Sequence, residues 1–242
     1  MSADIVFRVD LPHGRCVGVR VPGADEEKGL TCLASKEREF FESLSPARRP
    51  TWLAGRIALH EALRDLGLAA GPILATKRGA PELPDGVVGS ISHKRTLAVA
   101  LAARKDGGSS IGIDIEPIPA TALSPAEPGW GNRPDISSRI MTPEELRALA
   151  SIPEPLRRRE VVLHFSIKEA LYKAINPLVG RYVSFQEATV LPRADGGVTV
   201  TLALAKREGP LAAEARWSEI GGHLLTTARV WPSEQDCHGT NR

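Results

Sequence analysis

The sequence predicts an α+β fold built from two similar lobes. Each half of the 242-residue chain carries an amphipathic helix and runs of strand-forming residues joined through an Asp-Gly-Gly segment. The helix segments 56–63 and 168–175 also place their apolar residues alike. A duplicated, pseudo-symmetric α+β unit with a site in the cleft between its two halves is therefore expected.

The expected elements of the first half follow from apolar periodicity and from Pro and Gly breaks. They are short strands within residues 1–30, helices at 35–44 and 50–66, and strands at 87–92, 96–103 and 110–116. Ser35 is the expected cap of the first helix, and Gly67 ends the second. Asp106-Gly107-Gly108 lies between two strand-like runs, which predicts a hairpin between them.

The second half begins with a clear helix start at Thr142-Pro143-Glu144-Glu145, which offers a capping threonine, a first-turn proline and a glutamate three residues after the cap. The expected elements are helices at 142–150 and 155–175, strands at 184–191, 198–205 and 223–231, and a hairpin turn at 195–197. Pro177 is expected to stop the second helix.

A proline-rich segment divides the chain. The expected parts are an N-terminal lobe at 1–116, a Pro-rich loop at 117–134, a C-terminal lobe at 135–232 and a disordered tail at 233–242.

Composition and cysteine usage are those of a soluble globular protein with a net charge of +2. Cys16, Cys32 and Cys237 are odd in number and lack metal-ligand spacing, which indicates a reducing compartment. The first residues show no signal-peptide pattern, and no run of about eighteen apolar residues occurs. A cytoplasmic protein with no membrane span and no nucleic-acid partner is expected.

Basic side chains are in excess between residues 48 and 78. They are Arg48, Arg49, Arg56, Arg64, Lys77 and Arg78, against Glu61 and Asp65. Such an excess suits a phosphate-rich ligand. The alternative is a solvated helix face.

Asp114 and Glu116 form the most informative motif of the sequence. Alternate residues of a strand share a face, so these carboxylates point one way and Ile113 and Ile115 the other. A third acid, Glu169, comes from the distant helix, where it lies four residues before Lys173. Such oxygens suit a hard divalent cation that acts with a phosphate-bearing substrate. The alternatives are solvent-facing strand carboxylates and a surface ion pair.

Ser92 and His93 end a predicted strand, where a hydroxyl and an imidazole could donate to phosphate oxygens or simply complete a turn. A Ser/His hydrolase fits poorly, because Gly89-Ser90-Ile91-Ser92-His93 lacks the second glycine of a nucleophile elbow. Phosphate-binding Walker A and dinucleotide glycine motifs are also absent from the sequence.

Three ordered segments resemble the signatures of one family. They are Gly89-Ser90-Ile91-Ser92-His93, Gly112-Ile113-Asp114-Ile115-Glu116 and Phe165-Ser166-Ile167-Lys168-Glu169-Ala170-Leu171-Tyr172-Lys173. Over about residues 35–190 the chain resembles the 4′-phosphopantetheinyl transferases of the Sfp type, in the branch like enterobactin synthase component D. It departs from that branch at Leu83, where a tryptophan is common, and at Asn176, where an aromatic is common.

The resemblance implies a role for each matching residue. Magnesium, or manganese, would be bound by Asp114, Glu116 and Glu169. The coenzyme A diphosphate would be contacted by His93 and Lys173, with Ser92 nearby. The 3′-phosphate and adenine would be held on the N-terminal lobe by Arg48, Arg56, Lys77 and Arg78. The implied catalytic residues are Glu169 as the leading general base, Lys168 as a weaker candidate for it, and Lys173 and His93.

The implied reaction moves phosphopantetheine from coenzyme A to a serine of an acyl or peptidyl carrier protein and releases 3′,5′-ADP. A monomer is expected. The alternatives are a non-catalytic coenzyme A or nucleotide-binding protein and a magnesium-dependent phosphodiesterase. The sequence leaves open which carrier protein and which biosynthetic pathway, siderophore, nonribosomal peptide or polyketide, the chain serves.

Overall fold

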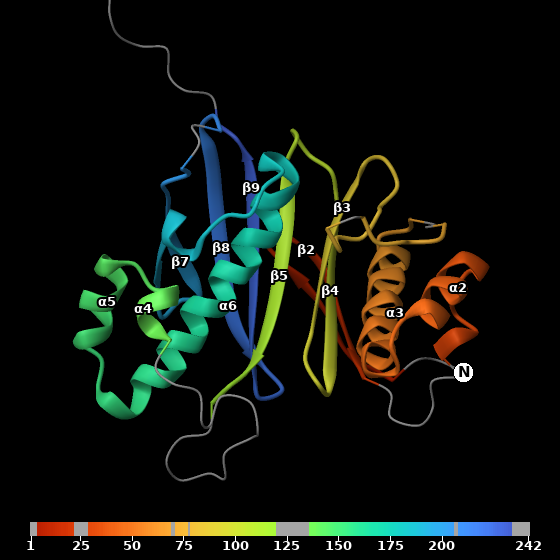
Figure 1. The fold of residues 1–242 in the computed structure, drawn as a ribbon, viewed down its shortest axis with the longest axis horizontal. Helices are drawn as coiled ribbons and strands as arrows, with labels where there is room; N and C mark the ends of the chain where they lie inside the picture. The colour runs from red at the N-terminus through yellow and green to blue at the C-terminus, as the bar shows by residue number, and fades with distance from the viewer. Residues whose placement is uncertain are drawn as a thin grey trace, which may run out of the picture.

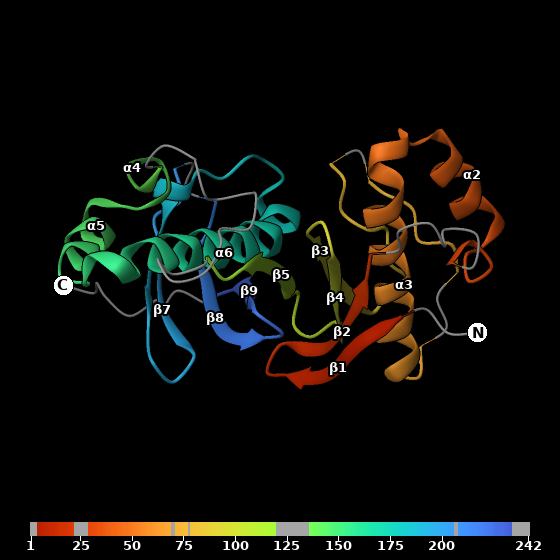
Figure 2. The ribbon, with the colours of Figure 1, turned by 90° about the horizontal axis from the view of Figure 1, so that it is seen from below.

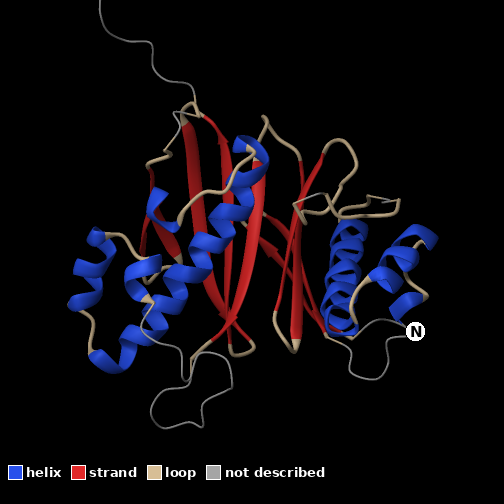
Figure 3. Ribbon diagram, in the orientation of Figure 1, coloured by secondary structure: helices blue, strands red, loops and turns tan. Residues whose placement is uncertain are grey.

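Two antiparallel sheets lie face to face, and a long helix covers the outer face of each (Figures 1 and 2). The computed structural model describes residues 4–21, 29–68, 71–76, 78–119, 136–205 and 208–233. Figure 3 shows how helices flank the strands on both sides. The α+β class with two lobes is confirmed.

The first lobe contains a four-stranded sheet in the order β1-β2-β4-β3. Its strands are β1 (Ile5–Leu11), β2 (Gly14–Arg20), β3 (Val87–His93) and β4 (Leu97–Arg104). Its helices are α2 (Ser35–Ser43), the short 3-10 helix η1 (Pro46–Arg48) and α3 (Arg49–Asp65). The predicted helices and strands of this lobe are therefore confirmed, although Ala34 rather than Ser35 caps α2.

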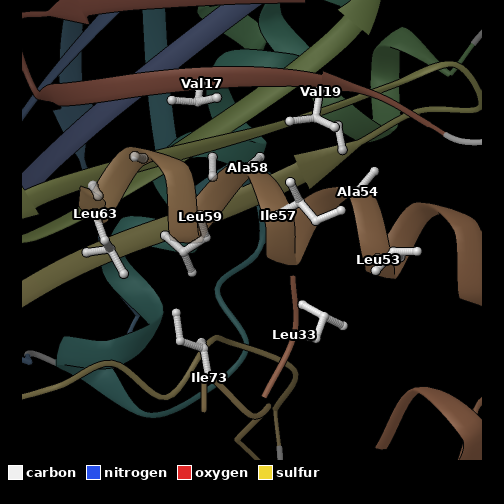
Figure 4. Close-up of a cluster of buried hydrophobic side chains, with 14 of the residues drawn as sticks. Val17, Val19, Leu33, Leu53, Ala54, Ile57, Ala58, Leu59, Leu63 and Ile73 are labelled. Carbon is white, nitrogen blue, oxygen red and sulfur yellow. The ribbon is translucent and has the colours of Figure 1, made fainter. Parts of the chain in front are cut away.

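Helix α3 packs its apolar side against the sheet of the first lobe. Figure 4 shows Ala54, Ile57 and Ala58 on the side of the helix that faces Val17 and Val19 of β2. Arg64, one of the basic residues noted between positions 48 and 78, is exposed on this helix. Burial of this apolar stripe fixes α3, and with it the start of the basic segment, against the first sheet.

The second lobe contains a five-stranded sheet in the order β5-β9-β8-β7-β6. Its strands are β5 (Ser110–Pro117), β6 (Ala188–Pro192), β7 (Gly197–Leu202), β8 (Leu211–Ile220) and β9 (His223–Pro232). Its helices are α4 (Ser137–Ile140), α5 (Pro143–Ala150), α6 (Glu154–Val179) and the 3-10 helix η2 (Phe185–Glu187).

Strand β5 belongs to the second sheet, which corrects the predicted hairpin at 106–108. Strand β4 already has β2 and β3 on its two sides, so it has no free edge for β5. The segment instead carries the chain from one sheet to the other, with Gly107 and Gly108 at positive φ. The sheets divide between β4 and β5, whereas the expected N-terminal lobe extends to residue 116.

An apolar layer fills the space between the two sheets. Strand β5 contributes Ile111, Ile113 and Ile115, which pack with Val99 and Leu101 of β4. Since the isoleucines face this layer, Asp114 and Glu116 face the other way, toward α6. The predicted separation of acids and isoleucines on the two sides of the strand is confirmed.

Local signals explain the start of α5 but not the end of α6. Thr142 accepts a hydrogen bond from the amide of Glu145, whose side chain accepts from the amide of Thr142, so the predicted capping box is confirmed. Helix α6, however, continues through Pro177 to Val179 and ends at Gly180 with φ 66°. The prediction that Pro177 stops α6 was wrong. Proline cannot donate a backbone hydrogen bond, but in the last turn this loss affects only the end of the helix, which then closes at Gly180.

Several expectations fall outside the described residues, including most of the Pro-rich loop, almost all of the tail, Lys77 and Cys237. Cys16 and Cys32 are free thiols. In the described part of the chain, no helix has both the length and the apolar character needed to cross a membrane.

Candidate active site

Asp114 is a buried carboxylate that accepts hydrogen bonds from both lobes. It is 3% exposed, and its Oδ1 accepts hydrogen bonds from Ser92 Oγ at 2.7 Å and Lys173 Nζ at 2.9 Å. Its Oδ2 accepts a hydrogen bond from Ser166 Oγ at 3.0 Å. Because Ser92 is on β3 and Ser166 and Lys173 are on α6, Asp114 joins the edge of the first sheet to the helix of the second lobe.

The hydroxyl of Thr226 supports this arrangement from β9. Thr226 lies opposite Asp114 in the strand register. Its Oγ1 is 2.9 Å from the hydroxyl oxygen of Ser166 and donates to the Ser166 carbonyl at 2.9 Å. Thr226 therefore fixes the side chain that donates to Asp114 Oδ2.

Glu116 is even more deeply buried, with 1% of its surface exposed. Lys94 Nζ lies 2.5 Å from Glu116 Oε1. Lys94 comes from the turn that follows β3, so this ion pair is a second link from the first lobe to β5.

Glu169 lies near the same charges. Partial burial raises the pKa of its carboxyl, and Asp114 raises it as well, while Lys173 and Lys94 lower it. Asp114 is therefore close enough to repel the charged form of Glu169, and a shared cation would relieve that repulsion. The three predicted acids thus belong to one electrostatic neighbourhood at the junction of the lobes.

His93 lies close to three cationic side chains. Partial desolvation lowers the pKa of its imidazole, and Lys173, Lys94 and Arg48 lower it further by repulsion. The side chain lies at the end of β3, and the nearby Asp114 carboxylate offsets part of this lowering of the pKa. The lowered pKa favours the neutral imidazole, which has one N–H to donate.

The carboxylates are the right type of ligand for a hard cation, but their arrangement in this structure is not that of a metal site. Their oxygens are the ligands that magnesium prefers. Lys173 and Lys94 nevertheless form ion pairs with Asp114 and Glu116. Within the residues that the structure describes, no group of three or more His, Cys, Asp or Glu side chains is arranged to hold a metal ion.

The predicted coenzyme A residues are only partly brought together. Arg48 lies close enough to His93 to affect its pKa, whereas Arg78 is exposed in the loop before β3. Ser92 is buried and donates to Asp114, so its observed contact is with a carboxylate. Lys77 lies outside the described residues.

Arg56 is buried rather than displayed on a helix surface. Its guanidinium lies 5.0 Å from the centre of the Trp52 ring and donates to the carbonyl of Leu74 at 3.2 Å. Burial lowers its pKa to about 10, so it remains a cation at neutral pH. Its Nε is buried and has no hydrogen-bond partner in the described ranges. The interpretation of the basic run as a solvated face therefore fails at this residue.

Lys168 faces away from the acids, which argues against the predicted role as a general base. Its Nζ donates at 2.8 Å to the carbonyls of Ile140 and Phe185 and to Glu145 Oε2. Both Lys168 and Glu145 are almost completely buried. Because all three N–H groups are used, the ammonium ties α6 to α4, α5 and η2.

Replacing Lys168 with methionine is expected to destabilise the protein by about 3–5 kcal/mol, because Glu145 would lose its partner for a buried charge. Urea denaturation measures the change. The matched control, Lys105→Met, removes a lysine that is exposed in the turn after β4 and should change stability by less than about 0.5 kcal/mol. Equal stability of the two variants would contradict the structural role of Lys168.

Three residues of the site were missed from the sequence. Ser166 lies three and seven residues before Glu169 and Lys173, so helical periodicity places all three on one face. Thr226 carried no such signal, because its place opposite Asp114 depends on pairing of strands 112 residues apart. Lys94 follows His93 directly, but its direction toward Glu116 depends on how the two lobes meet.

A hollow of about 200 Å³ lies elsewhere, between the β1–β2 turn and strands β8 and β9. It is lined by residues that include Pro12, Arg216 and Thr227 and by none of the predicted site residues. The candidate active site is thus defined by its charges and hydrogen bonds and not by this hollow.

Comparison with known proteins covers both lobes. Residues 36–103 match the family described as 4′-phosphopantetheinyl transferase N-terminal domain, and residues 110–228 match the 4′-phosphopantetheinyl transferase superfamily. The second match begins at β5, in agreement with the division between the sheets.

Individual proteins are also similar. The chain is 34% identical over 212 residues to 4′-phosphopantetheinyl transferase Svp of Streptomyces mobaraensis, which covers 83% of this chain and 80% of the relative. It is 38% identical over 159 residues to enterobactin synthase component D of Salmonella typhi, which covers 63% of this chain and 58% of the relative. A solved holo-(acyl-carrier-protein) synthase from Bacillus anthracis in complex with CoA aligns at 20% identity and a TM-score of 0.37, over 51% of this chain and 96% of that chain.

The family follows from the extent of these matches. The two matched regions together span most of the chain, and the Streptomyces relative is similar over four fifths of its own length. The chain belongs to the 4′-phosphopantetheinyl transferase superfamily, as an enzyme of the Sfp type.

Proposed function

We propose that the chain transfers phosphopantetheine from coenzyme A to a serine of an acyl or peptidyl carrier protein, with a divalent metal held by Asp114, Glu116 and Glu169. The observation that carries the proposal is the position of two buried carboxylates on β5, facing a third acid and Lys173 on α6. Buried like charges persist where cations neutralise them, and a phosphoryl-transfer site supplies such cations.

Magnesium fits the oxygen donors of this set, and manganese shares their chemistry. When bound, the ion would neutralise charge that develops on the transferred phosphoryl group. Ser166 and Ser92 hold the two oxygens of Asp114 in fixed directions. The hydroxyl groups thereby limit which lone pairs of Asp114 can face an ion.

His93 and the basic residues would receive coenzyme A. His93 and Lys173 lie beside the carboxylates and would contact the diphosphate. Arg48, Arg56 and Arg78, together with Lys77, would hold the 3′-phosphate and adenine end. The buried guanidinium of Arg56 supports this assignment. Its Nε has no hydrogen-bond partner among the described residues, so it could donate to a phosphate oxygen.

The chemistry requires one bond to form and one to break. The carrier serine oxygen would attack the β-phosphorus of coenzyme A, and the bond from that phosphorus to the bridging oxygen would break to release 3′,5′-ADP. The serine proton would pass to Glu169, directly or through a water molecule. Lys173 would offset negative charge on the phosphates. A monomer that works in the cytoplasm belongs to the same proposal.

Mass spectrometry of an apo-carrier protein tests this function. After incubation with the enzyme, coenzyme A and magnesium, the carrier is expected to gain the mass of one phosphopantetheine on its serine, and 3′,5′-ADP should appear in equal amount. A non-catalytic coenzyme A-binding protein would leave both molecules unchanged. A phosphodiesterase would cleave coenzyme A without modifying the carrier, and either result would reject the transferase.

A further inference from the structure

Lys94 is the charged residue of the site to which neither the motifs nor the proposed function gives a task. It stands in the turn between β3 and β4, where its amide donates to the carbonyl of Leu97 at 2.7 Å. Its ammonium reaches across to the second lobe and lies 2.5 Å from Glu116 Oε1. The side chain of Lys94 is 34% exposed, whereas that of Glu116 is 1% exposed.

We propose that Lys94 competes with the divalent metal for Glu116 and so weakens metal binding to the enzyme before coenzyme A arrives. This proposal rests on the metal site of the proposed function. A lysine ammonium and a metal ion cannot contact the same carboxylate oxygen at full strength, because each repels the other. The metal therefore has either to displace Lys94 from Glu116 Oε1 or to bind the other oxygen against the repulsion of the nearby ammonium.

The electrostatics of the neighbourhood support such competition. Lys94 is close enough to lower the pKa of both Glu169 and His93, so its charge acts on an acid of the proposed metal set as well as on Glu116. Removal of a unit charge at this distance from partly buried carboxylates is worth more than at a free surface. We expect a tenfold effect on metal affinity, to order of magnitude.

The two lysines of the site differ in how easily they can leave. Lys173 donates to the main-chain carbonyl of Ile113 at 2.8 Å as well as to Asp114. Lys94 sits on a partly exposed turn, and its four-carbon stem allows the ammonium to move out. Its position beside His93 places the displaced charge near the residues proposed to contact the diphosphate. Lys94 thereby would couple the arrival of an anion to release of Glu116.

Direct titration with Mn²⁺ tests the inference in the intact protein without coenzyme A. The electron paramagnetic resonance signal of free Mn²⁺ gives the Kd for wild type, Lys94→Met and Arg95→Met. Arg95 is exposed in the same turn, so its variant loses the same charge one residue away. We expect Lys94→Met to lower the Kd about tenfold, and Arg95→Met to change it less than about twofold.

A double variant shows whether the gain passes through Glu116. In the Glu116→Gln background, Lys94→Met is expected to improve Mn²⁺ binding less than about twofold, because the carboxylate under competition is gone. The increase in Tm on addition of Mn²⁺ provides a second readout, which should be larger for Lys94→Met than for wild type. A variant that starts from a lower Tm can still be judged by this increase.

The outcomes separate the two proposals. If wild type binds Mn²⁺ and loses it in Asp114→Asn, but Lys94→Met and Arg95→Met have equal Kd values, the competition is rejected and the metal site stands. If neither wild type nor Lys94→Met binds Mn²⁺, both the metal site and the competition are rejected. A gain in Lys94→Met that persists in the Glu116→Gln background also overturns the inference.

Discussion

Replacement of Glu169 by alanine is expected to lower phosphopantetheine transfer at least about a thousandfold while the protein stays folded. The carboxylate is half-buried on α6, near Asp114, Lys173 and Lys94. It is proposed both to hold the metal and to accept the serine proton, so its loss removes two functions at once. The transfer rate measured by mass spectrometry of the carrier, together with circular dichroism, checks both parts of the expectation.

Two variants control this experiment. Glu169→Gln keeps the size of the side chain and removes its charge, so it should be as inactive as the alanine variant. Glu154→Ala makes the same chemical change at the exposed start of the same helix and should retain near-normal turnover. Turnover close to that of wild type in Glu169→Ala would disprove the assignment of the active site.

Replacement of Gly112 by alanine is expected to destabilise the protein by about 3 kcal/mol. A Cβ at this position would lie 1.9 Å from the carbonyl oxygen of Ala170 and 2.9 Å from the amide of Ala174. Both are backbone atoms of α6, so they cannot rotate away. The helix would have to move off β5, and the contact between Lys173 and Asp114 would lengthen with it.

Urea denaturation and transfer assays measure the two consequences. The matched control is Gly71→Ala, where an added Cβ meets nothing within 4 Å, and it should change stability by less than about 0.5 kcal/mol. An unchanged midpoint for Gly112→Ala would mean that α6 and β5 approach each other less closely than described here.

Local chemistry made much of the fold predictable. The capping box at Thr142, the apolar stripe of α3 and the turn at Asp195-Gly196-Gly197 each act over a few residues, so the sequence displays them directly. Strand β8 was missed because Leu211–Ile220 is rich in alanine and charged residues, which favour strands weakly. The segment predicted as a strand at 184–191 begins instead with η2, where Ser184 caps the 3-10 turn.

The wrong prediction of a hairpin at 106–108 shows that local sequence does not determine which strands pair. The turn at Gly107 and Gly108 was predicted correctly, but the pairing of the strands around it was not. Strand β4 is already paired with β2 and β3, so β5 pairs with β9 in the other sheet. The same limit applies to the site. The acids and Lys173 were identifiable from spacing and resemblance, whereas the contacts of Lys94 and Thr226 depend on distant pairing.

The pairing of β5 with β9 also means that the active site can form only late in synthesis of the chain. Asp114 and Thr226 are 112 residues apart, so at roughly ten residues per second β5 is synthesised about ten seconds before its partner strand. All strands of the first sheet have been synthesised once the chain reaches Arg104. The isoleucines of β5 can therefore pack against this sheet during that interval. The carboxylates reach their final positions only when β9 has been added. A ribosome that stalls before residue 223 would therefore leave a nearly finished first lobe and no active site.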